Sequence, residues 1–382
     1  MNINADQAAM KPLLKEVVFL LHNYSVMDCC NPSAVYSNGR KTRRALETAR
    51  KEVASSIGAD ADEIYFTSGA TEAINWVMKS VPKNIITTRI EHKAIYKNAF
   101  DVDTDKCVYT VPIDLNGRII TECLDQLCTN RKILVIGWVN NEIGTIQPVE
   151  EIIDICHKNE TKVFIDATQA IGHIPINVHE LDVDYLCGSF GKLGGLSGCG
   201  FLYCKKGEIL EPFILGGGQE HGMRASTENI LGIFAGAIAI TNSTNDINIK
   251  MSQTQQKRDM IISELLKIPK SHLNGSMGNR VCNNINISFE GIDGESLVLQ
   301  LDTRGIQCST GSACNSQNIE PSHVLKAIGL SNDLARSSIR ITIGDDITDE
   351  EINYLIKNVK ECVEQLRSMS PKWKEIIDLN DR

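Results

Sequence analysis

The chain has 382 residues, of which 42% are hydrophobic, and a formal net charge of -9 at pH 7. This length and apolar content are enough for one large core and a smaller one, so two domains are expected. The acidic balance argues against sequence-independent binding of nucleic acid, and no segment approaches the roughly 20 apolar residues that a membrane span requires.

The thirteen cysteines are scattered along the chain, and none of them forms a Cys-x-x-Cys pair. Residues 1–9 have neither the charged nor the apolar region of an export signal. We therefore expect a cytoplasmic protein with reduced thiols. Cys29 and Cys30 are adjacent but have no His or Cys partners at metal spacing, so we expect no bound metal.

Short β-branched runs alternate with helical patterns through the middle of the chain, which favours right-handed βαβ units and a mainly parallel sheet. Ligands of such sheets bind outside the carboxyl ends of the strands. The segment 68–71 and the residues His92, Asn141, Asp166 and Ser189 follow predicted strands, so we expect them on one rim. The predicted strands are 63–67, 84–88, 132–139, 162–165, 183–187 and 199–203.

The pattern changes near residue 229, where a helix rich in Ala, Gly and Ile leads to a polar stretch at 241–249 and then to another helix. Strands at 284–289 and 338–343 and an amphipathic helix at 348–369 follow, which indicates a smaller α/β domain. We expect three parts, which are an N-terminal arm at 1–13 packing with the small domain, a large domain at 14–240 and the small domain at 241–382.

The run 66–73 (FTSGATEA) predicts a strand, a glycine turn and a helix with Thr71 near its N-terminus. Free backbone N–H groups and the helix dipole at such a turn favour a phosphate, by roughly 0.3 to 2 kcal/mol from the dipole alone. An ordinary helix cap, with Glu72 adding charge to the first turn, explains the run equally well.

Lys192 lies in the run 189–195 (SFGKLGG), where glycines allow a flat, bulky group to approach the backbone. Asp166 directly follows the apolar run 163–165, where a carboxylate is poorly placed for solvent and needs a cationic partner. An acid at such a strand end can keep a ring nitrogen protonated. Together the two residues predict a Schiff-base site for pyridoxal phosphate.

Other candidate residues have an ordinary alternative. His92 is suited to stacking on a planar cofactor or to proton transfer, but a lone loop histidine is usually solvated. Asn141 is equally consistent with an ordinary turn. Cys314 follows small residues in the run 309–316 (STGSACNS), which predicts an accessible thiol on a loop rather than a packed one. Arg340 alternates with apolar neighbours on a short strand, where a guanidinium needs an anion.

Taken together, the motifs resemble those of the cysteine desulfurases of the NifS and IscS kind, in the class-V aminotransferase group of fold-type-I pyridoxal phosphate enzymes. The resemblance covers nearly the whole chain, and the motifs occur in the family's order. The matching segments are 6–12 (DQAAMKP), 31–33 (NPS), 68–72 (SGATE), 91–93 (EHK), 140–144 (NNEIG), 166–169 (DATQ), 216–220 (GGGQE), 312–314 (SAC), 320–322 (EPS) and 337–340 (SSIR).

The resemblance implies a fold-type-I transferase that converts L-cysteine to L-alanine, with a persulfide formed on Cys314 and passed to an acceptor protein, for iron-sulfur cluster assembly or another sulfur transfer. It also implies a homodimer with shared active sites. The implied roles are a Schiff base on Lys192, a proton on the ring nitrogen held by Asp166, a hydrogen bond from Gln169 to the ring oxygen, stacking by His92, phosphate contacts from Ala70, Thr71, Ser189 and the partner's Thr227, and substrate carboxylate contacts from Asn141 and Arg340.

The chain departs from the family pattern next to the lysine and at the N-terminus. Gly191 stands where the family has a histidine that donates to the phosphate, and a lost charge-assisted hydrogen bond costs about 1.5 to 3 kcal/mol. Met10 and Lys11 replace paired threonines, and His221 and Ser226 replace arginine and glycine. We expect weaker cofactor retention, in a divergent member from a fast-evolving lineage such as that of a large DNA virus.

Two other functions stay open on the sequence. One is a catalytically impaired scaffold or binding protein on the same fold, which Gly191 and the N-terminal changes favour. The other is a different pyridoxal phosphate lyase or transaminase, in which Cys314 has no role. An NAD site is rejected, because the run 195–200 (GLSGCG) has the wrong glycine order and precedes a strand.

Overall fold

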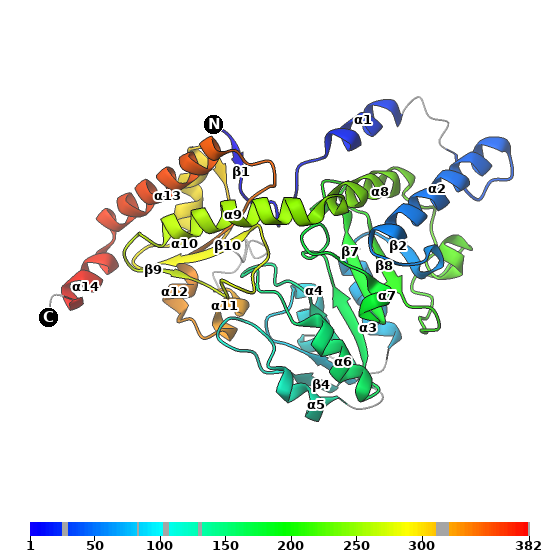
Figure 1. Cartoon of the computed structure of the whole chain (residues 1–382), viewed down its shortest axis with the longest axis horizontal. Helices are drawn as coiled ribbons and strands as arrows, with labels where there is room; N and C mark the ends of the chain where they lie inside the picture. Colours follow the sequence, from blue (N-terminus) through cyan, green and yellow to red (C-terminus); the bar gives the residue numbers. More distant parts are fainter. Residues whose placement is uncertain (25–29, 82–83, 102–106, 129–131, 311–320, 381–382) are drawn as a thin grey trace.

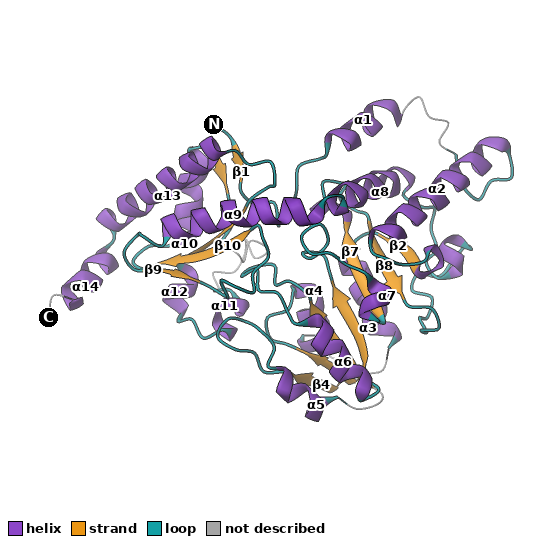
Figure 2. Ribbon diagram, viewed as in Figure 1, coloured by secondary structure: helices purple, strands orange, loops and turns teal. Residues whose placement is uncertain are grey.

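A seven-stranded sheet forms the centre of the larger part of the molecule (Figures 1 and 2). This computed structural model describes residues 1–24, 30–81, 84–101, 107–128, 132–310 and 321–380. The strands of the sheet are β2 (Ile64–Thr67), β3 (Asn84–Thr87), β4 (Cys107–Thr110), β5 (Lys132–Gly137), β6 (Lys162–Asp166), β7 (Tyr185–Ser189) and β8 (Gly200–Cys204).

The strand order is β2-β8-β7-β6-β5-β3-β4, and only β8 runs antiparallel to its neighbours. The expected α/β fold with a mostly parallel sheet is therefore confirmed. All six predicted strands are present to within a few residues. Strand β4 was missed, because it lies at the sheet edge and its four residues are exposed or only half-buried, so it lacks the apolar run of a buried parallel strand.

Helices cover both faces of this sheet. On one face lie α2 (Ser37–Ser56), α6 (Val149–Lys158) and α8 (Ile230–Thr244), and on the other lie α3 (Ala70–Ser80) and α4 (Lys93–Phe100). Along β5, Leu134 and Ile136 pack into the core on the side of α2, α6 and α8, whereas Ile133 and Val135 pack into the core on the side of α3 and α4. Burial on both faces explains the continuous apolar run that identified the strand.

Shorter helices complete the large part. They are α1 (Lys15–Tyr24), which packs against α8, α5 (Leu124–Leu127), α7 (Val178–Leu181) and the 3-10 turns η1 (Ala61–Glu63), η2 (Thr121–Cys123), η3 (Phe190–Lys192) and η4 (Gln219–Gly222). None of the helices in the described ranges is long and apolar enough to cross a membrane.

The C-terminal part has its own sheet and its own core. Strands β9 (Ser271–Leu273), β10 (Asn284–Phe289) and β12 (Ser338–Thr342) pair antiparallel in the order β12-β10-β9. A core that includes Ile285 and Ile339 joins this sheet to α9 (Ile247–Leu265), α10 (Gly294–Thr303) and α13 (Asp349–Met369). The remaining helices are α11 (His323–Ala327), α12 (Asn332–Arg336) and α14 (Pro371–Asn380).

The N-terminal arm connects the two parts. Strand β1 (Ile3–Asn4) pairs in parallel with β11 (Ile306–Gln307), and Asp6 forms a bridge with Thr342 of β12. The arm then reaches the large part, where the N–H of Lys11 donates to the carbonyl of Gly191 at 3.4 Å. The first eleven residues therefore run from the small sheet to the turn that carries Lys192.

Candidate active site

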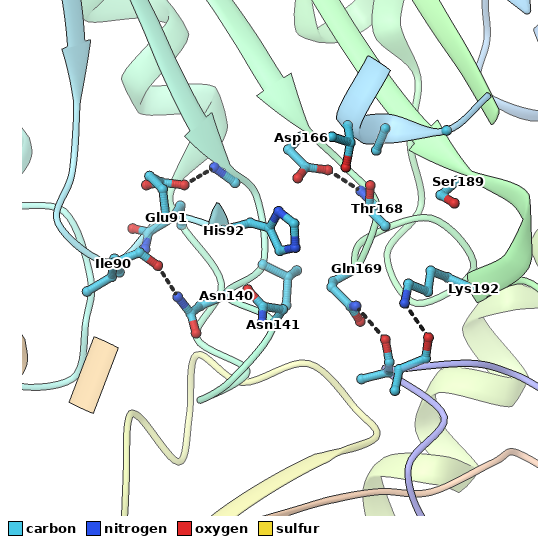
Figure 3. Close-up of a pocket in the computed structure, with 18 of the residues that line it drawn as sticks. Ile90, Glu91, His92, Asn140, Asn141, Asp166, Thr168, Gln169, Ser189 and Lys192 are labelled. Carbon is cyan, nitrogen blue, oxygen red and sulfur yellow. Dashed lines mark hydrogen bonds between the residues drawn. The ribbon is translucent and has the colours of Figure 1, made fainter. Parts of the chain in front are cut away.

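A cavity of about 410 Å³ lies at the carboxyl ends of the parallel strands (Figure 3). Its walls come from the turn before α3, the ends of β5, β6 and β7, the N-terminal arm and β12. Its lining residues include Ala8, Ala9, Ser68, Gly69, Ala70, Thr71, Glu91, His92, Asn140, Asn141, Asp166, Thr168, Gln169, Ser189, Lys192 and Arg340.

The glycine turn before α3 forms one end of the cavity. Gly69 has φ +149° and precedes the first helical residue, Ala70, so the free N–H groups of the first turn are available to an anion. Gly200 of β8 allows this approach, because a Cβ there would lie 2.7 Å from the Cα of Gly69. Ser189, the last residue of β7, also lines this region.

The charge of Glu72 is neutralised within the first turn of α3. Its carboxylate accepts from Arg224 at 2.9 and 3.1 Å and from the N–H of Ser68 at 2.9 Å. The positive end of the helix therefore faces the cavity without an opposing free acid, which favours a phosphate over an ordinary capped helix at this turn.

Asp166 and Lys192 line the same cavity from neighbouring strands. Asp166 ends β6, is 9% exposed, and accepts from the N–H of Thr168 at 3.0 Å. Lys192 lies in the turn after β7, and its Nζ donates to the carbonyl of Ala9 (Figure 3). Burial, together with Asp166, raises the pKa of Cys187 well above its usual range, so that thiol stays protonated.

His92 caps α4 and directs its ring into the cavity (Figure 3). Its Nδ1 accepts from the N–H of Ala94 at 3.1 Å. Burial lowers the pKa of His92, Asp166 opposes this effect, and Lys192 and Lys93 lower the pKa further. The ring is therefore neutral at pH 7, and because Nδ1 accepts, the proton resides on Nε2.

The N-terminal arm contributes backbone carbonyls to the site. The Nε2 of Gln169 donates to the carbonyl of Ala8 at 3.1 Å, next to the contact between Lys192 and Ala9. The adjacent arm residue, Met10, packs beside Gly191. A Cβ at Gly191 would lie 3.5 Å from the sulfur of Met10 and 3.3 Å from the hydroxyl of Ser197, so Met10 occupies the space of a larger side chain before Lys192.

Arg340 reaches the cavity from β12, although it is only 5% exposed. Its Nη1 donates to the carbonyl of Asn141 at 2.9 Å, and its Nη2 lies 2.7 Å from the carboxylate of Asp6. Its Nε is buried and has no hydrogen-bond partner among the described residues. The guanidinium belongs to a residue that lines the cavity, and a forked cation in that position is suited to a carboxylate ligand.

Two buried acids beside the cavity were quoted in motifs but given no role by the sequence reasoning. Glu91 accepts from the hydroxyl of Thr88 at 2.6 Å and from the N–H of Gly137 at 2.7 Å, and burial raises its pKa to about 7. Burial likewise raises the pKa of Glu142 to about 7, although its contact with the Ser322 hydroxyl, at 2.5 Å, opposes this shift. The only available signal was the position of each acid beside a predicted site residue, since Glu91 precedes His92 and Glu142 follows Asn141.

One predicted site residue within the described ranges, Thr227, is not among the residues that line this cavity. Thr227 is exposed and lies outside the lining of the cavity, as expected if it acts on the site of a partner subunit. Cys314 lies outside the described residues. The other predicted residues, Ala70, Thr71, His92, Asn141, Asp166, Gln169, Ser189, Lys192 and Arg340, all line the one cavity.

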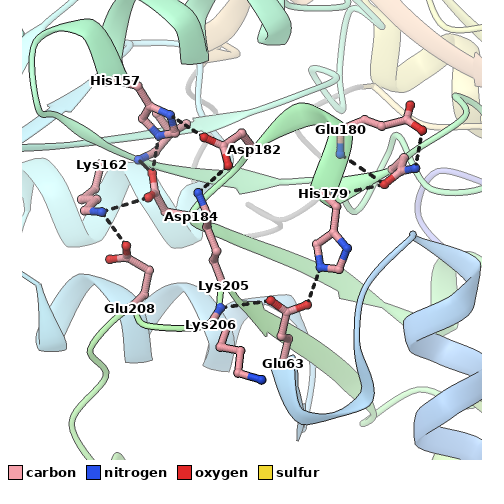
Figure 4. Close-up of polar contacts among 12 residues, drawn as sticks. Glu63, His157, Lys162, His179, Glu180, Asp182, Asp184, Lys205, Lys206 and Glu208 are labelled. Atoms are coloured by element: carbon pink, nitrogen blue, oxygen red, sulfur yellow. Dashed lines mark hydrogen bonds and ion pairs between the residues drawn. The ribbon is translucent and has the colours of Figure 1, made fainter.

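Within the described residues, one group could bring three metal ligands together. Asp60, Glu63 and His179 have ligand atoms within 4.8 Å of one another, and none of the three lines the cavity. Figure 4 shows Glu63 and His179. The carboxylate of Glu63 already contacts His179 at 2.8 Å and accepts from the N–H groups of Asp60 and Lys206 at 2.9 and 3.0 Å. These ordinary polar contacts account for the cluster without an ion.

Comparisons with known proteins give one consistent family. The model of the class-V aminotransferases matches residues 3–355. The cysteine desulfurase IscS of Methanosarcina thermophila is 41% identical over 96% of this chain and 93% of its own. The cysteine desulfurase IscS of Dictyoglomus turgidum is also 41% identical, over 97% of each chain. The solved structure of a NifS-like protein has a TM-score of 0.90 and 33% identity, over 96% of this chain and 100% of that chain. The chain therefore belongs to the class-V aminotransferase family, and within it to the cysteine desulfurases of the IscS and NifS kind.

Proposed function

We propose that this protein is a cysteine desulfurase that uses pyridoxal 5'-phosphate to convert L-cysteine to L-alanine and retains the sulfur as a persulfide on Cys314. The observation that carries the proposal is the convergence of Lys192, Asp166 and the glycine turn on one cavity. Relatives that match nearly the full length of the chain carry the same activity in their names.

The residues of the cavity fit the cofactor. The turn at Gly69 offers backbone N–H groups for a phosphate, Asp166 offers a buried carboxylate for a ring nitrogen, and the ring of His92 is neutral and faces the same space. Lys192 would hold the cofactor covalently through Nζ, and Thr71 and Ser189 would contact the phosphate. When bound, the cofactor supplies an electron sink for the charge that develops at the substrate α-carbon.

Lys192 has a second role once the substrate has displaced it. Its amine, in the neutral form, would be the base that moves the α-proton, because Lys192 lines the cavity in which the substrate would bind. Asp166 would keep the ring nitrogen protonated, and Gln169 would bond the ring oxygen. Asn141 and Arg340 would orient the substrate carboxylate, since both residues line the cavity.

Cys314 then accepts the sulfur. Its thiolate attacks the sulfur of the substrate, so that an S–S bond forms while the C–S bond breaks, and the carbon retains the electron pair and takes up a proton to give alanine. We further propose that the enzyme is a homodimer in which the partner's Thr227 completes the phosphate site. The persulfide sulfur passes to an acceptor protein, for iron-sulfur cluster assembly or another sulfur transfer, in a cytoplasmic compartment.

We propose the following division of the chain. The arm at 1–13 packs with the small domain, residues 14–240 bind the cofactor, and residues 241–382 form the small domain that carries Cys314. The pairing of β1 with β11 and the separate core around Ile285 support these boundaries.

Borohydride reduction of the cofactor-loaded protein tests the proposal. A pyridoxyl adduct should appear on Lys192 in the parent and be absent from Lys192→Ala. With L-cysteine, the parent should release alanine and gain one sulfur atom on Cys314. Absence of the adduct would overturn the cofactor assignment, and an adduct without turnover would identify an impaired scaffold. Alanine release that survives in Cys314→Ala would identify a different lyase.

A further inference from the structure

Two cysteines outside the cavity face each other across a helix pair. The Sγ atoms of Cys128 and Cys156 are 3.5 Å apart, and the two residues are 3% and 0% exposed. Cys128 directly follows α5, and Cys156 lies in the last turns of α6. The reaction proposed above uses neither thiol.

Two hydrogen bonds, one on each side of the sulfur pair, hold this contact in place. The hydroxyl of Thr121 donates to Glu151 at 2.6 Å, and the side chain of Asn159 donates to Asp125 at 2.9 Å. Both bonds join the segment of α5 to α6. The approach of the two sulfurs is therefore a fixed feature of the folded chain and does not depend on the thiols alone.

The two thiols differ in their ease of ionisation. The S–H of Cys156 lowers the pKa of Cys128, although burial opposes this effect, and Thr161 and the ammonium of Lys132 lower it further. The same contact, together with burial, raises the pKa of Cys156. Cys128 is also the less deeply buried thiol and follows the exposed residues of α5, so it is the nucleophile of the pair and Cys156 the resolving partner.

We propose that Cys128 and Cys156 form a redox site that closes to an intramolecular disulfide when the protein meets a peroxide. The sulfur of Cys128 attacks a peroxide oxygen, the O–O bond breaks, and one water leaves with a sulfenic acid remaining on Cys128. The sulfur of Cys156 then attacks that sulfenic sulfur, the S–O bond breaks, and a second water leaves. Two thiols are oxidised, hydrogen peroxide is reduced to two waters, and the two thiols supply the two protons.

The local structure permits this reaction. A disulfide requires the two sulfurs to approach from 3.5 Å to about 2.05 Å. Helix α5 has only four residues, and Asp125 and Gln126 are exposed, so a peroxide gains access to Cys128 by local opening of α5, which breaks the hydrogen bond between Asn159 and Asp125. The disulfide would then join α5 to α6 covalently.

Peptide mapping of the cofactor-loaded full chain tests the proposal. The protein is treated with hydrogen peroxide, unfolded in iodoacetamide, and digested without reductant. The expected product is a peptide pair linked through Cys128 and Cys156, which dithiothreitol separates. The exposed Cys107 reports whether the peroxide dose was sufficient.

Matched variants separate this link from general oxidation. Cys156→Ser should lose the link and leave a sulfenic acid on Cys128 that dimedone captures, whereas Cys187→Ser, at another fully buried thiol, should retain the link. If Cys107 is fully oxidised while Cys128 and Cys156 are both still alkylated separately, the proposal is wrong. A link that forms only after unfolding in guanidinium would also overturn it.

Discussion

The guanidinium of Arg340 is paired with the carboxylate of Asp6, 334 positions earlier in the chain, with 2.7 Å between Nη2 and Oδ1. A second donor, Nη1, is used by the carbonyl of Asn141. A substrate carboxylate bound as proposed would therefore share Arg340 with an acid from the N-terminal arm. This arrangement gives Asp6 an influence on substrate affinity without direct contact with the reacting atoms.

Replacement of Arg340 should raise KM for L-cysteine while the cofactor stays bound. Loss of a charge-assisted hydrogen bond costs about 1.5 to 3 kcal/mol, so Arg340→Ala should raise KM roughly 10- to 150-fold. Arg340→Lys keeps the charge but not the forked geometry, so its KM should lie between that of the parent and that of Arg340→Ala. Asp6→Asn removes the competing charge and should lower KM. Steady-state alanine release measures these values, and an unchanged KM in Arg340→Ala would refute the role.

The contact between Gly191 and Met10 predicts a non-additive pair of substitutions. Gly191→His alone should destabilise the protein by roughly 1 to 3 kcal/mol, because the new ring must displace Met10 from a filled space. Gly191→His combined with Met10→Thr should recover this loss and bind the cofactor more tightly than the parent, roughly tenfold or more.

Thermal unfolding and cofactor dissociation constants of the two single variants and the double variant complete this cycle. The effects of the two substitutions should be non-additive, both on the free energy of unfolding and on cofactor affinity. If the single effects simply add, Met10 does not limit the side chain at position 191.

The buried Glu142 should make stability depend on pH. Its pKa is about 7 in the folded chain and 4.5 as an ordinary value, so the folded state holds the proton more tightly. Its contribution to stability is fully present below pH 4.5 and is lost as the pH rises through about 7, a loss of about 3 kcal/mol.

Glu142→Gln removes this titration and keeps an acceptor for the Ser322 hydroxyl. Urea unfolding at about pH 5 and about pH 8 should therefore show a smaller loss of stability in the variant than in the parent. Glu91, which has a similar pKa, accounts for the loss that remains. An identical pH dependence in the two proteins would contradict the burial argument.

Asp166→Asn should separate cofactor binding from proton abstraction. The amide oxygen can still accept from the N–H of Thr168, so the strand end keeps its conformation. The charge that holds the ring proton is lost, and exchange of the substrate α-proton with D2O should slow roughly 10- to 150-fold. Nuclear magnetic resonance of L-alanine in D2O measures this rate. The control Cys187→Ser, at the thiol 3.7 Å from Asp166, should exchange at the parental rate.

The large sheet could be predicted from the sequence because its strands are buried on both faces, as Leu134 and Val135 show. The same reasoning located the cavity, since His92, Asp166 and Ser189 each follow a strand and parallel strands end on one side. Strand β4 lacked such a signal because it lies at an exposed edge.

The remaining features depend on contacts between distant segments. The carbonyls of Ala8 and Ala9 reach Gln169 and Lys192 only because the arm is held by pairing with the small sheet. No local pattern reports the burial of Glu142 against Ser322, which is 180 positions away. The steric relation between Met10 and Gly191 likewise needed a three-dimensional structure.

The arm also sets an order of events during synthesis. Ile3 is synthesised long before its strand partner, Ile306, and Asp6 is synthesised long before its bridge partner, Thr342. Until that late stretch has emerged, the opening segment cannot dock, and the pocket lacks part of its wall. The wall that the arm supplies is therefore completed late, after the segment around Thr342 has been made.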